Sequence, residues 1–226
     1  MQSSTLLLFK KIYSHFINPI ESIKFDIRKI LFIYAKIKIN YYYKIKITKN
    51  NLLFEPDYLD LNNLINLISK IKPKTVIEFG GGYSTLIIAF ALNKIHKNKN
   101  YEFVTLDQDK KFLKITKGLI NQKFKKKIIF IHRKLSVKKF KKKLVSYFSN
   151  IPVKNYDFVY EDRYDHKKTK IAGDIMFLIR KNKRYFSFCV DGMTDTVNFL
   201  KIHLRSKYKI SNGFFHGVNF IFRESL

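Results

Sequence analysis

The stretch TVIEFGGGYST, residues 75–85, decides the fold of this chain. Its first five residues predict a short, largely apolar strand, and a helix is predicted from Ser84 onward. The three glycines between them let the backbone turn sharply and approach a ligand, because no Cβ is in the way. Either Ser84 or Thr85 can cap the helix that follows. The stretch therefore predicts a ligand site in a loop between a strand and a helix.

Two familiar glycine motifs do not fit this loop. A phosphate-binding P-loop requires a lysine after the glycines, and none is present. The dinucleotide fingerprint G-x-G-x-x-G requires a glycine at position 85, which is threonine. A carboxylate two residues before the first glycine, Glu78, is also a poor companion for a pyrophosphate. These departures disfavour a nucleotide hydrolase and a nicotinamide-dependent enzyme.

Strands and helices are predicted to alternate on both sides of this loop. Further strands are expected at residues 101–106, 127–131, 156–160, 185–190, 208–211 and 218–222, and helices at 84–96, 110–119, 137–149, 168–181 and 195–206. Five strand–helix units followed by a strand pair predict an α/β fold. The expected form is a doubly wound, mostly parallel, seven-stranded sheet with an antiparallel strand at its end. Ligands bind such sheets at the carboxyl ends of the strands.

The first 50 residues are predicted to form a basic N-terminal helical and β extension, before a domain over residues 51–226. Helical spacing is found at residues 6–16 and 20–34, and alternation over 36–47 predicts a strand with one basic face. A further helix is expected from Pro56-Asp57 to just before Pro73. The basic start has two interpretations. It is a pair of helices covering a core, which we favour, or an arm that contacts an anionic membrane surface or an acidic substrate.

The net charge of the chain is +28, from 45 basic and 17 acidic residues. Of the basic residues 38 are lysines and 7 are arginines, and the accompanying excess of Ile, Asn, Phe and Tyr is typical of an A/T-rich genome. Arginine is the better residue for bidentate recognition of phosphate and guanine. The charge is therefore weaker support for nucleic-acid binding than its size suggests. No run of about 20 apolar residues predicts a transmembrane helix, and we expect a cytoplasmic protein.

The glycine loop resembles that of class I S-adenosylmethionine-dependent methyltransferases. These enzymes carry E-x-G-x-G between the first strand and the first helix, which Glu78-Phe79-Gly80-Gly81-Gly82 matches. The continuation Tyr83-Ser84-Thr85 resembles a G-Y-S-T variant of the family, although many members have a third glycine where Ser84 stands. The resemblance extends over roughly Asp57 to Arg223. It implies the cofactor S-adenosylmethionine, whose cationic sulfonium and ammonium suit an acidic strand end.

The resemblance also implies which residues hold the cofactor. Asp107 ends the second predicted strand, where the family places the acid that accepts the ribose hydroxyls, and Asp109 is the fallback. The implied cofactor-binding residues are Glu78, Gly80, Gly81, Gly82, Tyr83, Ser84, Asp107, Gln108 and Asp162.

The loop after the fourth predicted strand is the expected catalytic loop, since the family places it beside the transferred methyl group. Asp162, Glu161 and His166 are the candidates for a base that accepts the proton of an acceptor hydroxyl. The alternative is that one of these carboxylates pairs with Arg163 or with nearby lysines.

A metal site is the weaker expectation at this edge. In the catechol-type branch of the family, acids at the positions of Asp162 and Asp191 bind Mg²⁺ together with an asparagine. Gly192 stands at the asparagine position, so one ligand is missing. We therefore predict no metal, with Asp162 and Asp191 as the pair to consider.

The function predicted from these features is methyl transfer from S-adenosylmethionine to a small-molecule or saccharide-like acceptor, at oxygen. One alternative is a methyltransferase of RNA or another nucleic acid, which the charge favours. The other is a non-catalytic module that binds S-adenosylmethionine. The loop lacks an N-P-P-Y or D-P-P-Y signature, which argues against amino methylation of nucleobases.

Overall fold

A computed structural model of the chain describes residues 27–42, 56–97, 100–120, 122–163, 169–181, 186–204, 209–212 and 219–222. The chain divides into two compact units. The first comprises Met1–Lys46 with Asp57–Asn62, and the second comprises Ile47–Pro56 with Asn63–Leu226. The helix predicted over residues 6–16 and the end of the strand predicted over 36–47 lie outside the described residues.

The first unit contains a helix over residues 27–37 that continues as the π-helix η1 (Lys38–Tyr42). The helix confirms the later part of the helical spacing predicted over residues 20–34. The strand predicted from Lys36 is wrong as far as Tyr42, because the chain there stays helical. The physical reason is that residues on one face of the helix form an ion pair and ring contacts along its length.

Those partners lie at the start of the next helix, in the same unit. Arg28 forms an ion pair with Asp57, with 3.2 Å between Nη2 and Oδ2. One and two turns further along the same face, Phe32 meets the Tyr58 ring edge-on and Lys36 holds its ammonium 5.5 Å from the centre of that ring. Positions four residues apart share a helix face, so these contacts favour helix over strand.

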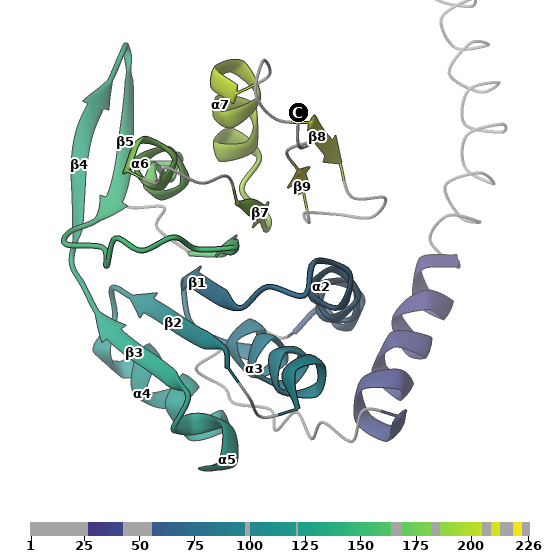
Figure 1. Cartoon of the computed structure of the whole chain (residues 1–226). Helices are drawn as coiled ribbons and strands as arrows, with labels where there is room; N and C mark the ends of the chain where they lie inside the picture. Colours follow the sequence, from purple (N-terminus) through teal and green to yellow (C-terminus); the bar gives the residue numbers. More distant parts are fainter. Residues whose placement is uncertain are drawn as a thin grey trace, which may run out of the picture. The chain divides into compact units, whose positions relative to one another are not determined.

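The second unit is built on a seven-stranded sheet (Figure 1). Its strands are β1 (Thr75–Phe79), β2 (Glu102–Asp107), β3 (Ile128–His132), β6 (Phe158–Glu161), β7 (Ser187–Val190), β8 (Lys209–Asn212) and β9 (Asn219–Phe222). Their order is β3-β2-β1-β6-β7-β9-β8. The first five are parallel, whereas β9 runs antiparallel to both of its neighbours. The predicted fold class is confirmed.

This strand order places a topological switch point between β1 and β6. The chain runs outward from β1 through β2 to the edge strand β3, and then returns to pair β6 with the other side of β1. Ligands of doubly wound sheets bind at the carboxyl ends of strands beside such a reversal. The glycine loop follows β1, so the topology puts it at this point.

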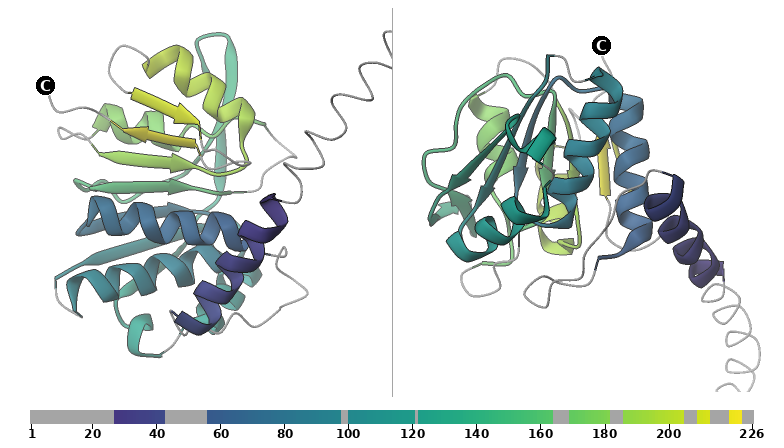
Figure 2. Two further views of the ribbon diagram at one scale, coloured as in Figure 1. Left: turned by 90° about the vertical axis from the view of Figure 1, so that its right-hand side faces the viewer. Right: turned by 90° about the horizontal axis from the view of Figure 1, so that it is seen from below.

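Helices cover both faces of the sheet (Figures 1 and 2). They are α2 (Tyr58–Ile71), α3 (Tyr83–His96), α4 (Lys110–Leu119), the short α5 (Gln122–Lys125), α6 (Asp174–Lys181) and α7 (Thr194–Leu204). The helices α3 and α4 lie on one face, and α6 and α7 on the other. Ile77 and Phe79 of β1 join the core of the α6 and α7 face, as expected for alternate residues of a buried strand.

The basic helix predicted over residues 137–149 is wrong. These residues form an antiparallel hairpin, β4 (Leu135–Phe140) and β5 (Lys143–Phe148), which is a separate two-stranded sheet. Lysine-rich sequence is compatible with a helix, but aromatic and β-branched residues of the hairpin find core partners. Phe148 stacks on Phe79, and Phe140 packs edge-on against Phe199 of α7. Tertiary packing thus overrides the local helix propensity.

None of the helices in the described ranges combines the length and apolar character needed to cross a membrane.

Candidate functional site

The first residue of the glycine loop, Gly80, joins three strand ends. Its N–H donates to the carbonyl oxygen of Leu106 at 2.8 Å, and Phe79 before it accepts from the N–H of Asp162 at 2.9 Å. Gly80 has a φ of +96°, and a Cβ at this position would lie 2.6 Å from the backbone oxygen of Asp162. Only glycine fits both the conformation and the close approach. The loops after β1 and β6 therefore lie in contact.

A buried carboxylate, Glu78, supports the loop from beneath. Its two oxygens accept hydrogen bonds from the hydroxyls of Ser84 at 2.7 Å and Thr85 at 2.6 Å. The hydroxyl of Thr85 in turn accepts from the N–H of Gly82 at 3.1 Å, which caps the start of α3. Glu78 is fully buried, and burial raises its pKa from 4.5 to about 7. Glu78 and Ser84, both predicted to contact the cofactor, thus contact each other.

The predicted ribose acid, Asp107, holds the loop from the side. One carboxylate oxygen accepts from the N–H of Gly81 at 2.9 Å, and the other accepts from the N–H of Asp109 at 2.7 Å. Burial raises the pKa of Asp107 above its ordinary value. Asp109 itself caps α4, since its carboxylate accepts from the N–H groups of Lys111 and Phe112. The structure thus gives the two neighbouring acids different tasks.

The remaining residues of the predicted cofactor set differ in their surroundings. A Cβ at Gly81 would lie 3.2 Å from the hydroxyl oxygen of Thr116, whereas a Cβ at Gly82 would meet nothing within 4 Å. Gly82 therefore borders open space. Tyr83 is buried at the first position of α3. The carbonyl oxygen of Gln108 lies 3.0 Å from Nε2 of His132, which must donate because a carbonyl only accepts.

The carboxyl ends of β6 and β7 carry the acids of the predicted catalytic edge. Asp162 is exposed, and its backbone is held against the glycine loop. The Tyr160 hydroxyl donates to Oδ2 of Asp191 at 2.7 Å. Burial raises the pKa of Tyr160 well above its ordinary value, and the charges of Asp191 and Asp162 add to the effect. Tyr160 is thus a neutral donor between two acids. His166 lies outside the described residues.

The second predicted base, Glu161, points into a buried ion-pair cluster. Its side chain is fully buried, and Oε1 lies 3.5 Å from Nε of Arg163. Arg163 also meets Asp174 of α6, with 2.7 Å between Nη1 and Oδ2. Both contacts are ion pairs without a hydrogen bond. Burial raises the pKa of Glu161 far above its ordinary range, and Arg163 opposes that shift. These contacts favour a structural role for Glu161.

No group of three or more histidine, cysteine, aspartate or glutamate side chains within the described ranges could hold a metal ion. The carboxylate of Asp191 is engaged by Tyr160.

The sequence pattern predicts Thr85 only as a helix cap, although Thr85 also links Glu78 to Gly82. It predicts no role for Tyr160 or Asp174. Strand alternation could have found Tyr160, because it pairs in register with Glu78 and so shares its face of the sheet. Nothing local pointed to Asp174, which reaches Arg163 only through the fold.

Comparisons with known proteins give matches among solved structures. The structural alignment with the METTL16 methyltransferase domain covers 86% of this chain and 94% of that domain's chain, with a TM-score of 0.53 and 14% sequence identity. The human methyltransferase 10 domain-containing protein gives the same coverages, with a TM-score of 0.51 and 15% identity. An O-methyltransferase from Bacillus cereus covers 84% of this chain and 88% of its own, with a TM-score of 0.48 and 12% identity.

No family model and no curated protein matches the sequence. The likeness therefore lies in the three-dimensional structure, at identities that show the fold alone. From its strand order and the two matches with TM-scores above 0.5, the chain has the fold of the class I methyltransferases.

Proposed function

We propose that this protein is an S-adenosylmethionine-dependent methyltransferase. The observation that carries the proposal is the hydrogen bond from Gly81 to Asp107. It joins the loop after β1 to the end of β2 at the carboxyl edge of the sheet, beside the switch point where such folds bind ligands. The likeness to solved methyltransferases supports the fold on which this site stands.

The described residues fit the cofactor. Gly82 borders open space, so a ligand can approach the backbone there. Each carboxylate oxygen of Asp107 accepts one backbone hydrogen bond and has capacity for another, which two ribose hydroxyls can use. The exposed carboxylate of Asp162 gives this edge a negative charge, which suits a cationic ligand.

The cofactor set is best divided by the contacts observed. Gly80, Gly81, Gly82, Asp107 and Asp162 form the surface that we assign to the cofactor, with Tyr83 and Gln108 at its margins. Glu78 and Ser84 keep the loop in shape through their mutual hydrogen bond. Mutations in the two sets should therefore differ in whether they change affinity alone or stability as well.

We infer that the acceptor is a small-molecule or saccharide-like compound with a reactive hydroxyl. When bound, S-adenosylmethionine supplies a methyl group activated by its sulfonium. Asp162 is the base that we assign, because its exposed side chain follows the strand end in contact with the glycine loop. Its task is to accept the proton of the acceptor hydroxyl as the oxygen is methylated. Glu161 is less suited to this task, since it is buried against Arg163.

Nucleic acid is a second candidate acceptor, favoured by the exposed lysines of the β4–β5 hairpin. The two candidates overlap chemically, because the ribose of RNA carries a saccharide hydroxyl.

Calorimetric titration with S-adenosylmethionine, S-adenosylhomocysteine and NAD tests the proposal without knowledge of the acceptor. We expect the two methionine derivatives to bind at a single site and NAD to give no heat of binding. Binding of NAD alone would contradict the proposal. Binding of S-adenosylmethionine without transfer to any acceptor would instead identify a non-catalytic binding module.

A further inference from the structure

Positive charge is concentrated in one continuous part of the chain. Residues 110–156 contain 15 lysines and Arg133 but no aspartate or glutamate, so this fifth of the sequence supplies 16 of the 28 net charges. The rest of the chain mixes 29 basic residues with all 17 acidic ones. An even spread would place about three or four acids in this segment. A genome-wide preference for lysine codons does not account for a local absence of acids.

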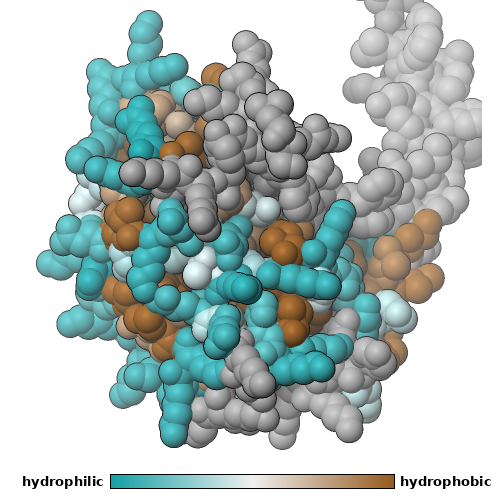
Figure 3. All heavy atoms as spheres, viewed as in Figure 1, coloured by the Kyte–Doolittle hydropathy of each residue, from teal (hydrophilic) through white to brown (hydrophobic). Residues whose placement is uncertain are grey.

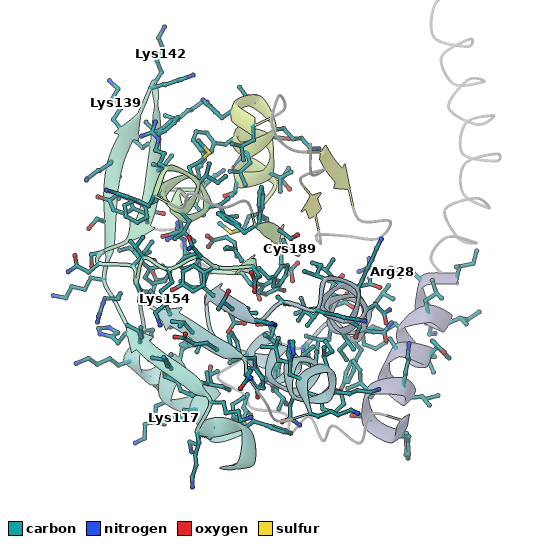
Figure 4. All side chains as sticks on the ribbon, in the orientation of Figure 1. Arg28, Lys117, Lys139, Lys142, Lys154 and Cys189 are labelled. Atoms are coloured by element: carbon teal, nitrogen blue, oxygen red, sulfur yellow. The ribbon has the colours of Figure 1, made fainter. Side chains whose placement is uncertain are left out.

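The acid-free segment comprises α4, α5, β3 and the β4–β5 hairpin. β3 is an edge strand of the sheet, and the hairpin packs against α6 and α7 on one face of the sheet. Six exposed lysines lie on the hairpin or directly before its first strand. We call this group the lysine hairpin: Lys134, Lys138, Lys139, Lys141, Lys142 and Lys143. Figure 4 shows Lys139 and Lys142 projecting away from the rest of the molecule near the hairpin tip. The same side of the molecule is largely hydrophilic in Figure 3.

Within the described part of the chain, none of the six lysines of the lysine hairpin forms an ion pair, whereas Lys154 outside the hairpin pairs with Glu102. The ammonium of Lys138 lies 5.2 Å from the centre of the Tyr147 ring. Like charges on one short hairpin repel one another, and a polyanion laid along it would remove that repulsion.

The hairpin is fixed to the candidate site at its base. The carbonyl oxygen of Ser146 in β5 accepts from the guanidinium of Arg163 and, at 2.7 Å, from the N–H of Gly173. The N–H of Ser146 donates to the carbonyl oxygen of Ile171 at 3.0 Å. Arg163 directly follows Asp162, the base that we assign. These hydrogen bonds hold the hairpin next to the loop of Asp162. A ligand chain that binds along the hairpin can therefore extend to the candidate site.

We propose that the lysine hairpin binds single-stranded nucleic acid and guides it toward the carboxyl edge of the sheet. As a statement about the acceptor, this rests on the proposed methyltransferase function. Lysines are point charges that attract the phosphate backbone without reading bases, so binding is independent of sequence. A single strand suits the surface, because its flexible backbone can follow a short basic element and bring a ribose hydroxyl to the candidate site.

An anionic membrane is the competing partner, and the hairpin tip argues against it. The turn consists of Lys141 and Lys142 and lies between the paired residues Phe140 and Lys143. The ring of Phe140 packs against Phe199 of α7, so it is not available to enter a lipid layer. The exposed apolar residues Val137 and Leu144 lie on the strands instead. Membrane-inserting elements bury an apolar face below the headgroups.

The test measures the binding of a fluorescent 20-nucleotide oligouridylate to the full-length protein. The fluorescence anisotropy of the oligonucleotide reports binding, at a range of salt concentrations. The variant replaces Lys139, Lys141, Lys142 and Lys143 by glutamine. In the matched control, glutamine replaces four exposed lysines outside the acid-free segment: Lys70, Lys72, Lys74 and Lys97. Both lose four charges, so any difference between them reports position rather than net charge.

We expect the hairpin variant to bind at least about tenfold more weakly at low salt. Its slope of log K against log salt should be less steep by about 3, at about 0.7 for each lost phosphate contact on a single strand. The control should keep most of the affinity and the slope. Equal losses in the two variants would overturn the proposal, as would unchanged binding of the hairpin variant.

Two further measurements separate the outcomes. Sedimentation with vesicles of phosphatidylcholine and phosphatidylglycerol tests the membrane, and a hairpin variant that loses vesicle binding but keeps oligouridylate binding would overturn the proposal. Titration of the hairpin variant with S-adenosylmethionine should give the affinity of the unmodified protein. If the unmodified protein binds the oligonucleotide through the hairpin but not S-adenosylmethionine, the proposed function fails and the nucleic-acid surface stands.

Discussion

The carboxylate of Asp107 accepts a hydrogen bond from the backbone N–H of Gly81, across 2.9 Å and 26 positions of sequence. The end of β2 thereby fixes the position of the loop that follows β1. The second oxygen of the same carboxylate holds the N–H of Asp109, so Asp107 is itself held in one orientation. A carboxylate positioned in this way presents its remaining lone pairs in a defined direction at the carboxyl edge of the sheet.

Replacement of Asp107 by alanine should weaken the binding of S-adenosylmethionine by about ten- to a hundredfold. Charge-assisted hydrogen bonds to two ribose hydroxyls contribute roughly 1.5–3 kcal/mol together. Calorimetric titration measures the loss. Asp109→Ala is the matched control, because it removes only the cap of α4 and should cost about 1 kcal/mol of stability with little change in affinity. A greater loss of affinity in the control would assign the ribose to Asp109.

Valine at Gly82 should abolish cofactor binding and leave the protein folded, since a Cβ there enters open space. Valine at Gly80 should instead destabilise the fold, because φ is +96° and the Cβ would collide with the backbone of Asp162. Thermal unfolding and calorimetry separate the two effects. Normal affinity in Gly82→Val would place the cofactor elsewhere.

Asp162→Asn should reduce turnover by roughly 10²–10⁴, because the proton acceptor is lost. The affinity for S-adenosylmethionine should fall much less, because Asp162 is one of several residues in the surface that we assign to the cofactor. Transfer of labelled methyl groups to saccharides or to oligoribonucleotides measures turnover. Asp157→Asn is the control at the opposite end of β6, where the carboxylate accepts from the N–H groups of Lys74 and Thr75. A fully active Asp162→Asn enzyme that is also insensitive to EDTA would exclude both a base and a metal ligand at this position.

The pH dependence of stability should reveal the buried Glu78. Its pKa is about 7 in the folded state, above the ordinary 4.5, so the folded state retains a proton that the unfolded state loses between these values. Its contribution is therefore fully present below pH 4.5 and falls as the pH rises to 7, by up to about 3 kcal/mol. Urea unfolding at several pH values should show that Glu78→Gln removes this part of the slope. Glu102→Gln, at a partly exposed carboxylate paired with Lys154, should not.

The buried pair of Arg163 and Asp174 should be essential for stability. Arg163→Met would leave the carboxylates of Asp174 and Glu161 buried without their cation, at a cost of about 3–5 kcal/mol. Urea unfolding measures the change. Arg180→Met is the control, since Arg180 lies on the same helix as Asp174 but is exposed, with its guanidinium over the ring of Phe140. A loss below 1 kcal/mol in Arg163→Met would show that this cluster does not hold the catalytic loop.

Local pattern determined much of the fold. The glycine loop, the strands on either side of it and the helix over residues 110–119 follow from apolar runs, periodicity and caps within about 15 residues. The parallel sheet follows because strands that alternate with helices can pair only through crossovers. The hairpin over residues 135–148 and the helix through residues 36 and 37 did not follow, because core contacts with Phe79 and partners at Asp57 and Tyr58 override local propensity.

The sequence by itself placed Asp107, Asp162 and Asp191 at the ends of strands, because strand ends can be read from the local pattern. It could not tell which carboxylates face one another. Only the tertiary structure brought Glu161 to Arg163 and Asp174, and Tyr160 to Asp191. Successive residues of a strand point to opposite faces of the sheet, and the side chains that they meet there come from distant segments of the chain. In the same way, the acid-free segment was present in the sequence, but only the fold made its last part a hairpin and bonded that hairpin to Arg163, next to Asp162.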